Sequence, residues 1–241
     1  MFNGDTYISS SLYLGGTAIT ATAAELNLLD GVTAIGSGIL SSVTENSNTG
    51  VRLTTSNAAN HGDIGSNAVD LSYQNSTSST KGATGYAATA LGYLTTASGY
   101  YTTAMGDSST ASGTNSTAIG AYTTASGYNS TAMGRYTTAS KYASTAMGRN
   151  TTASGDVSTA MGDNTTASAE SSTAIGAYTT ASDYASLVIG RYNSSGSSVT
   201  NSATAFSTSN TAFVIGNGAD SSNKSDAFKV MFNGDATVSN D

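Results

Sequence analysis

The sequence predicts an all-β fold, a parallel β-solenoid whose turns are 14 residues long. A glycine recurs at this step through the middle of the 241-residue chain, each time after an apolar residue. An Ala-Ser pair recurs later in each period. Eight copies without an insertion or deletion indicate a repeat architecture. The glycines are Gly92, Gly106, Gly120, Gly134, Gly148, Gly162, Gly176 and Gly190.

Each half of the period is too short for a helix and is rich in threonine, which favours strands. Gly, Ser, Asn and Asp gather between the halves, as is typical of turns. The unit is therefore interpreted as strand, corner, strand, corner. Stacked units would pair each strand with its copy one turn later, in parallel and about 4.8 Å apart.

Alternation within the strands indicates which residues face the interior. Ser130, Ala132 and Gly134 share one face, whereas Thr131 and Met133 share the other. A coil of two short strands has a thin interior, which the small residues fit. The large apolar residues then point outward as a continuous apolar stripe, and such a stripe usually marks an interface. The alternative is that the stripe fills the interior and the alanines face outward. The apolar stripe consists of Leu91, Met105, Ile119, Met133, Met147, Met161, Ile175 and Ile189.

The phrases at 115–120 and 129–134, Asn-Ser-Thr-Ala-Ile-Gly and Asn-Ser-Thr-Ala-Met-Gly, carry a resemblance. With the Ala-Ser pair of each period, they resemble the repeats in the heads of trimeric autotransporter adhesins. This resemblance implies a left-handed parallel β-roll and a homotrimer packed about a central axis, which makes the apolar stripe the candidate trimer interface. The family commonly has Val where this chain has Thr117, Thr131 and Thr145. Matrix-protein ligands are therefore not carried over.

The N-terminal segment predicts one or two strands over Thr6–Thr17 and then a short helix. Thr22 and Glu25 form a capping box, and Gly31 ends the helix. Leu26 and Leu29 need a surface to pack on, which the same helix of partner chains would provide. They are therefore further trimer-interface candidates. The run 18–32 also resembles a segment common in phage tail-fibre proteins, which favours a viral origin.

The predicted organisation has four parts: N-terminal strands and helix (1–33), a transition that caps the solenoid (34–80), the repeats (81–192), and a C-terminal cap with a hairpin (193–241). Strand-like pieces lie at Val51–Thr54 and Ala68–Tyr73. The repeat phrase returns at Thr211–Gly216, two residues out of phase, and phenylalanines suit a closing cap. Residues 227–238 predict a β-hairpin over a type I′ turn at Asn233-Gly234.

The amino-acid composition disfavours several classes of function and partner. The net charge is −7, from 8 Lys and Arg against 15 Asp and Glu, which disfavours nucleic acid and anionic membranes as partners. The chain has no Cys, hence no disulfides or thiolate metal sites, and no Pro, which suits long ladders. We see neither a signal peptide nor a transmembrane run, so we expect no membrane insertion.

No catalytic constellation is visible, so we expect no enzyme activity, no cofactor and no metal site. The single histidine, His61, lies in a Gly-rich turn beside Asp63 and is interpreted as structural or solvated. Acidic residues at the corners of the repeat are interpreted as solvated turn residues. They are Asp107, Asp156, Asp163 and Glu170.

Tyrosines recur at the corners in two columns that would stack as outward ladders. Two interpretations stay open: contact with a glycan or another receptor, and stacking between turns that stabilises the rod. The first column holds Tyr86, Tyr100, Tyr128, Tyr142 and Tyr184, and the second holds Tyr122, Tyr136, Tyr178 and Tyr192.

The sequence therefore predicts a structural fibre or adhesin segment on a virion or on an extracellular cell surface. Its expected partners are two further copies of itself, a cell-surface glycan or protein receptor, and further fibre or baseplate segments. A phage tail fibre is the first hypothesis and a bacterial autotransporter head the alternative. An ice-binding solenoid is a third, disfavoured because the adjacent Thr137 and Thr138 point to opposite faces.

Overall fold

The computed structural model describes residues 13–14, 17–18 and 39–239. The chain divides into two compact units, Met1–Gly38 and Ile39–Asp241. In the first unit, β1 (Tyr13–Leu14) pairs antiparallel with β2 (Thr17–Ala18). The predicted helix over 22–31, with Leu26 and Leu29, lies outside the described residues, so its role in a trimer stays a prediction.

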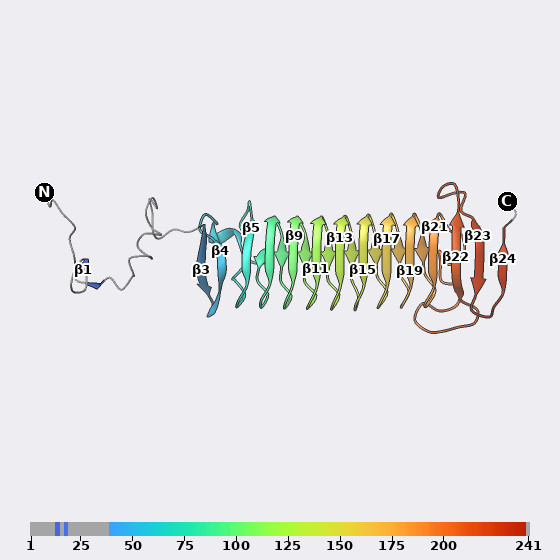
Figure 1. Ribbon diagram of the computed structural model, residues 1–241, viewed down its shortest axis with the longest axis horizontal. Coiled ribbons are helices and arrows are strands. Elements are labelled where there is room, and N and C mark those ends of the chain that lie inside the picture. Colours follow the sequence, from blue (N-terminus) through green and yellow to red (C-terminus); the bar gives the residue numbers. More distant parts are fainter. Residues whose placement is uncertain (1–12, 15–16, 19–38, 240–241) are drawn as a thin grey trace, which may run out of the picture. The chain divides into compact units, whose positions relative to one another are not determined.

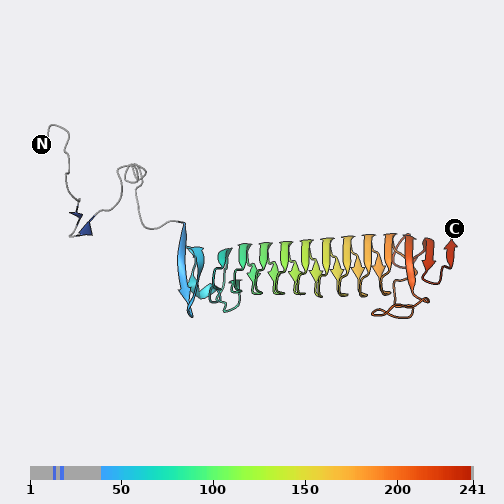
Figure 2. The same cartoon turned by 60° about the horizontal axis from the view of Figure 1, so that its bottom comes forward.

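The second unit is a solenoid of two parallel ladders, stacked along one direction (Figures 1 and 2). The prediction of an all-β parallel solenoid is confirmed. The long strands are β5 (Val69–Tyr73), β7 (Thr89–Tyr93), β9 (Thr103–Asp107), β11 (Thr117–Ala121), β13 (Thr131–Arg135), β15 (Thr145–Arg149), β17 (Thr159–Asp163), β19 (Thr173–Ala177) and β21 (Leu187–Arg191). The short strands are β6 (Gly82–Ala83), β8 (Thr96–Ala97), β10 (Thr110–Ala111), β12 (Thr124–Ala125), β14 (Thr138–Ala139), β16 (Thr152–Ala153), β18 (Thr166–Ala167) and β20 (Thr180–Ala181).

The register follows the sequence period. In the long sheet Ala132 pairs with Ala146 and Met133 with Met147, and in the short sheet Ala139 pairs with Ala153. Every repeat residue therefore stands above its own copy. The ladder thus turns each repeated position of the sequence into a column along the rod.

The interior is filled by small residues, as the alternation predicted. Ala132 and Ala139 are fully buried, and Ser130 and Thr137 are buried beside them. Met133 is 36% exposed, so the apolar stripe points outward and the alternative that it fills the interior is wrong. Gly134 does not share the interior, contrary to the expected alternation. It is exposed at φ +123° at the strand end.

One interior column consists of threonine, with Ser109 in one turn, and several of its threonine hydroxyls have no hydrogen-bond partner. The unpartnered Oγ1 atoms belong to Thr95, Thr137, Thr151, Thr165 and Thr179. Thr123 differs, because its Oγ1 donates to Ser109 Oγ at 2.9 Å. A buried hydroxyl without a partner costs about 1–3 kcal/mol.

We therefore expect Thr137→Val to raise the free energy of unfolding by about 1 kcal/mol, since a methyl group replaces the unpaired hydroxyl. Thr123→Val is the matched control and should lower that free energy, because it removes a hydrogen bond that is made. Thermal or urea unfolding of the two variants measures both changes. Equal shifts in the two variants would contradict the argument.

The corners hold non-glycine residues in the left-handed region. Val157 has φ +55°, Tyr136 has φ +55° and Asn129 has φ +56°. This conformation costs roughly 1–2 kcal/mol per residue outside glycine. Each corner is held by the turn before it, as where the Tyr136 N–H donates to the Ala121 carbonyl oxygen at 2.9 Å. The corners therefore tolerate bulky residues whose side chains project into solvent.

The N-terminal end of the ladder is covered by an antiparallel pair. β3 (Leu40–Glu45) pairs with β4 (Asn48–Leu53), which in turn pairs in parallel with β5 through Val51 and Val69. The strand-like pieces predicted near 51–54 and 68–73 correspond to β4 and β5. β3 was not predicted, and neither was the 3-10 turn η1 (Ala58–Asn60).

The C-terminal end is also covered by antiparallel strands. β22 (Thr211–Asn217) continues the parallel ladder with Gly216 opposite Gly190, because the intervening loop absorbs the phase shift. β23 (Asp226–Met231) and β24 (Ala236–Val238) then form the predicted hairpin. The predicted type I′ turn is wrong. It requires a positive φ at both central residues, whereas at Asn233-Gly234 only Gly234, at φ +92°, has one.

Candidate functional site

The outer face of the long sheet carries the apolar stripe along the repeats. Its side chains alternate with a threonine column that includes Thr131, and both columns face away from the buried alanines. Leu91, Met133 and Ile175 are more than one-third exposed in the single chain. A column of large apolar side chains that is continuous over β7 to β21 is typical of a surface that a partner covers.

The tyrosines form outward stacks, as expected from their columns. The ring centroids of Tyr128 and Tyr142 lie 5.8 Å apart with planes 6° from parallel. The corresponding values are 5.0 Å and 18° for Tyr122 and Tyr136, and 4.4 Å and 10° for Tyr178 and Tyr192. Tyr86 and Tyr100 are tilted at 6.0 Å, and Tyr184 is half-buried.

Stacking uses one face of each ring for its neighbour, so the ladders contribute cohesion between turns. Arginine side chains cover two of these rings. The Arg135 guanidinium lies 4.8 Å from the centroid of the Tyr136 ring, and the Arg191 guanidinium lies 5.1 Å from the centroid of the Tyr192 ring. Whether these tyrosines also contact a receptor stays a prediction.

Two further contacts between tyrosines were not predicted from the sequence. Tyr73 and Tyr93 stack at 6.0 Å with planes 17° apart, and Tyr101 meets Tyr86 edge-on at 5.4 Å. Tyr73 and Tyr93 are opposite in the long sheet, but their sequence separation is 20 residues. A search at the 14-residue step therefore could not find this pair.

One of the acidic corner residues, Asp163, forms an ion pair with Arg149. Arg149 donates to Asp163 from Nε at 2.9 Å and from Nη2 at 2.6 Å. This bidentate contact holds the pKa of the half-buried Asp163 carboxyl below its usual value. The pair links the ends of two successive strands, so Asp163 is an inter-turn contact in addition to a turn residue.

A buried charged cluster lies where the solenoid begins. Arg52 donates to Glu45 at 2.9 Å and 3.2 Å and to the Gly62 carbonyl oxygen at 3.0 Å. Its Nε lies 3.5 Å from Asp70 Oδ2, and His61 Nδ1 lies 2.8 Å from the same oxygen. His61 is therefore a buried residue paired with Asp70, and its sequence neighbour Asp63 is not its partner.

The Asp70 carboxylate is held ionised by this cluster. Burial raises the pKa of the Asp70 carboxyl, but hydrogen bonds from His61 and Ser72 outweigh burial and hold the pKa below its usual value. Because a carboxylate only accepts, His61 carries its proton on Nδ1. In the neutral ring, Nε2 is then left as a hydrogen-bond acceptor.

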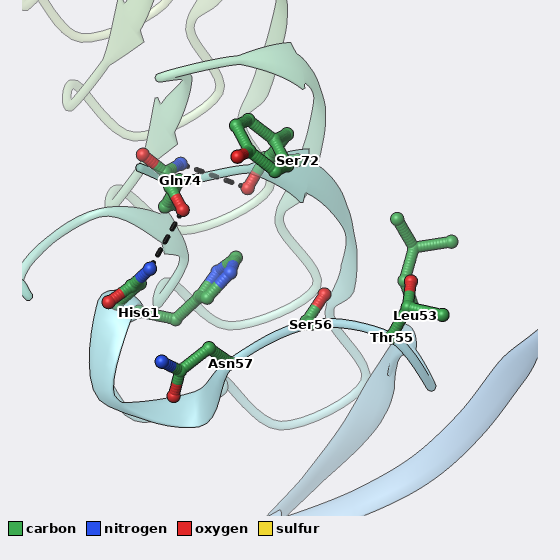
Figure 3. Close-up of a pocket in the computed structure, with 9 residues that line it drawn as sticks. Leu53, Thr55, Ser56, Asn57, His61, Ser72 and Gln74 are labelled. Carbon is green, nitrogen blue, oxygen red and sulfur yellow. Dashed lines mark hydrogen bonds between the residues drawn. The ribbon is translucent and has the colours of Figure 1, made fainter. Parts of the chain in front are cut away.

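A hollow of about 310 Å³ lies beside this cluster (Figure 3). The loop after β4 forms one wall and the end of β5 forms the other, with the His61 ring between Asn57 and Gln74. Gln74 is fixed by bonds from its Nε2 to Ser72 Oγ and to the Thr95 carbonyl oxygen. The lining residues are Leu53, Thr55, Ser56, Asn57, Asn60, His61, Ser72, Tyr73 and Gln74.

Among the described residues, no three His, Cys, Asp or Glu side chains gather so that they could hold a metal ion. Within the same residues, no helix has the length and hydrophobicity to cross a bilayer.

Comparison with protein families identifies the family to which the repeats are similar. The family model described as "YadA head domain repeat (2 copies)" matches seven overlapping windows that together cover residues 83–193. Residues 83–193 are YadA head domain repeats. No curated protein matches the chain. The matched windows run from β6 to the residues just after β21, so the YadA head repeats coincide with the regular part of the solenoid.

The YadA head assignment confirms the resemblance to adhesin heads. YadA-type domains form trimers, and YadA-like adhesin heads lie on the extracellular surface. The buried alanine columns and the apolar stripe both belong to the matched windows. The hollow and the charged cluster precede them, because all the residues that line the hollow or form the cluster lie before position 83. They are therefore features of this chain outside the YadA head repeats.

Proposed function

We propose that this chain is a non-enzymatic segment of a homotrimeric attachment fibre, which holds a receptor-contacting surface away from a particle or cell. The apolar stripe carries the proposal. One large apolar side chain per turn faces solvent in the single chain, and its burial on a trimer axis contributes roughly 1.5–3 kcal/mol per side chain. The YadA head repeats support both the trimer and the adhesin-like role.

The finer proposal is a phage tail fibre, with the head of a bacterial autotransporter adhesin as the alternative. Its support is the sequence of residues 18–32, which resembles tail-fibre segments. The YadA match itself favours the adhesin. The remainder of the gene tests the choice, because an autotransporter requires a downstream stalk and membrane anchor. Finding them would contradict the virion-surface location and the baseplate partner.

The solution mass of the purified chain tests the trimer. We expect light scattering to give three times the chain mass of 23.9 kDa, because the apolar stripe is then buried. A monomer at micromolar concentration would contradict the proposal. It would mean that the apolar stripe is exposed in solution, and it would favour a solenoid that functions as a single chain.

Ice binding is the second candidate function. The outer face of the short sheet carries an in-register threonine column from Thr96 to Thr180, beside a serine column that includes Ser126. The second column is serine, so the face lacks a two-column threonine array. A measurement of freezing-point hysteresis decides this candidate, and normal ice growth would exclude it.

A further inference from the structure

We propose that the hollow beside His61 binds one neutral sugar residue of a surface glycan. This inference rests on the proposed attachment function and names the chemistry of its receptor. The hollow is lined mostly by polar residues, is partly enclosed and lies at the N-terminal end of the solenoid. Its volume of about 310 Å³ is at the small end of ligand pockets, which suits a single ring rather than a long chain segment.

An aromatic wall is provided where the tyrosine stack of the long sheet ends. Tyr93 covers one face of the Tyr73 ring. On the other side the neighbouring strand, β4, stops at Leu53, and the loop that follows turns away to form the opposite wall of the hollow. Tyr73 is therefore 64% exposed. An exposed aromatic face packs well against the apolar C–H face of a pyranose ring.

Polar groups with unused hydrogen-bonding capacity face this wall. His61 is fixed by its Nδ1–H bond to Asp70, so Nε2 is directed as an acceptor. Asn57 Oδ1 accepts from the Ala59 N–H at 3.1 Å, which leaves its Nδ2 as a donor. Ser56 adds a hydroxyl that can do either. Donors and acceptors mixed in this way match sugar hydroxyls, each of which both donates and accepts.

The charge of the lining selects the ligand class. None of the nine lining residues is Asp, Glu, Lys or Arg. The charged Asp70 and Arg52 already have partners here, since Asp70 accepts hydrogen bonds from His61 and Ser72 and Arg52 donates to Glu45. An acidic sugar or a phosphate would find no counter-charge here, so the expected ligand is a neutral sugar.

Saturation-transfer NMR on the full chain tests the proposal, with N-acetylglucosamine, methyl β-galactoside and methyl α-glucoside as separate probes. We expect at least one to bind. Tyr73→Ala should weaken binding about tenfold or more, because the stacking face is lost. Ser56 lies in the loop, and its side chain makes no hydrogen bond. The larger side chain in Ser56→Trp should fill the hollow and abolish binding. Tyr101→Ala, which removes a tyrosine of comparable exposure elsewhere, should bind normally.

Three outcomes would overturn the sugar site: no saturation transfer to any probe, binding that survives Ser56→Trp, or binding lost only in Tyr101→Ala. Each is distinguishable from failure of the proposed fibre function, since light scattering is measured on the same samples. A trimer that binds no sugar overturns the sugar site alone. A monomer that binds sugar overturns the trimeric fibre alone.

Discussion

Gly134→Ala is expected to destabilise the solenoid severely. Gly134 has φ +123°, and an added Cβ would lie far inside contact distance of the Gly148 carbonyl oxygen and 2.9 Å from its carbon. Backbone strain of about 1–3 kcal/mol adds to overpacking of about 1–3 kcal/mol, so the free energy of unfolding should fall by about 2–6 kcal/mol. Because each turn contacts only its neighbours, the defect should interrupt the ladder between β13 and β15. Thermal unfolding followed by circular dichroism measures the loss.

Gly234→Ala separates the two causes. Gly234 also has a positive φ, +92°, but an added Cβ there would meet nothing within 4 Å. This variant should therefore show only the conformational cost, about 1–2 kcal/mol. Equal destabilisation by Gly134→Ala and Gly234→Ala would show that the contact with the next turn is not what requires glycine in the ladder.

The double variant Met133→Lys/Met147→Lys is expected to convert the proposed trimer into monomers. The two residues are opposite in register on the outer face of the long sheet, so the new ammonium groups would interrupt the middle of the apolar stripe. In a trimer they would also be brought together around the axis, away from water, where unpaired charges are costly. Light scattering should then report the mass of one chain, with the β-sheet circular dichroism signal retained.

Lysines on the other outer face provide the matched control. Ser112 and Ser126 are exposed beside the short sheet and stand one turn apart. Ser112→Lys/Ser126→Lys adds the same charge at the same spacing and should leave the mass unchanged. If both double variants dissociate, net charge is the cause, and the assignment of the axis to the apolar stripe fails.

The repeat determined how much of the fold could be predicted. Ala132 and Met133 alternate, and a thin coil accommodates only the smaller residue inside, so the inner and outer faces followed from volume. The register followed as well, because a period without insertions allows each residue to pair only with its own copy. The extra loop before β22 removed that constraint, although the glycine column still returned to register at Gly216.

The hollow and its charged cluster could not be predicted, since they depend on contacts without a repeat. His61 pairs with Asp70, nine residues away, and not with Asp63 close by, because the loop around η1 folds back against the end of β5. The hairpin turn at Asn233 shows a related limit. Asn-Gly favours type I′, but a four-residue loop with Gly234 alone at a positive φ connects the same strands.

Because the columns are in register, the length of the rod can change by whole turns. Because each turn offers the next one the same buried methyl groups and the same backbone donors, a whole turn of 14 residues can be inserted or removed without changing the register of any column. Each such step would move the proposed receptor-contacting end by about 4.8 Å. A duplication within the gene would thus lengthen the fibre in discrete increments, while the surfaces at both ends keep their chemistry.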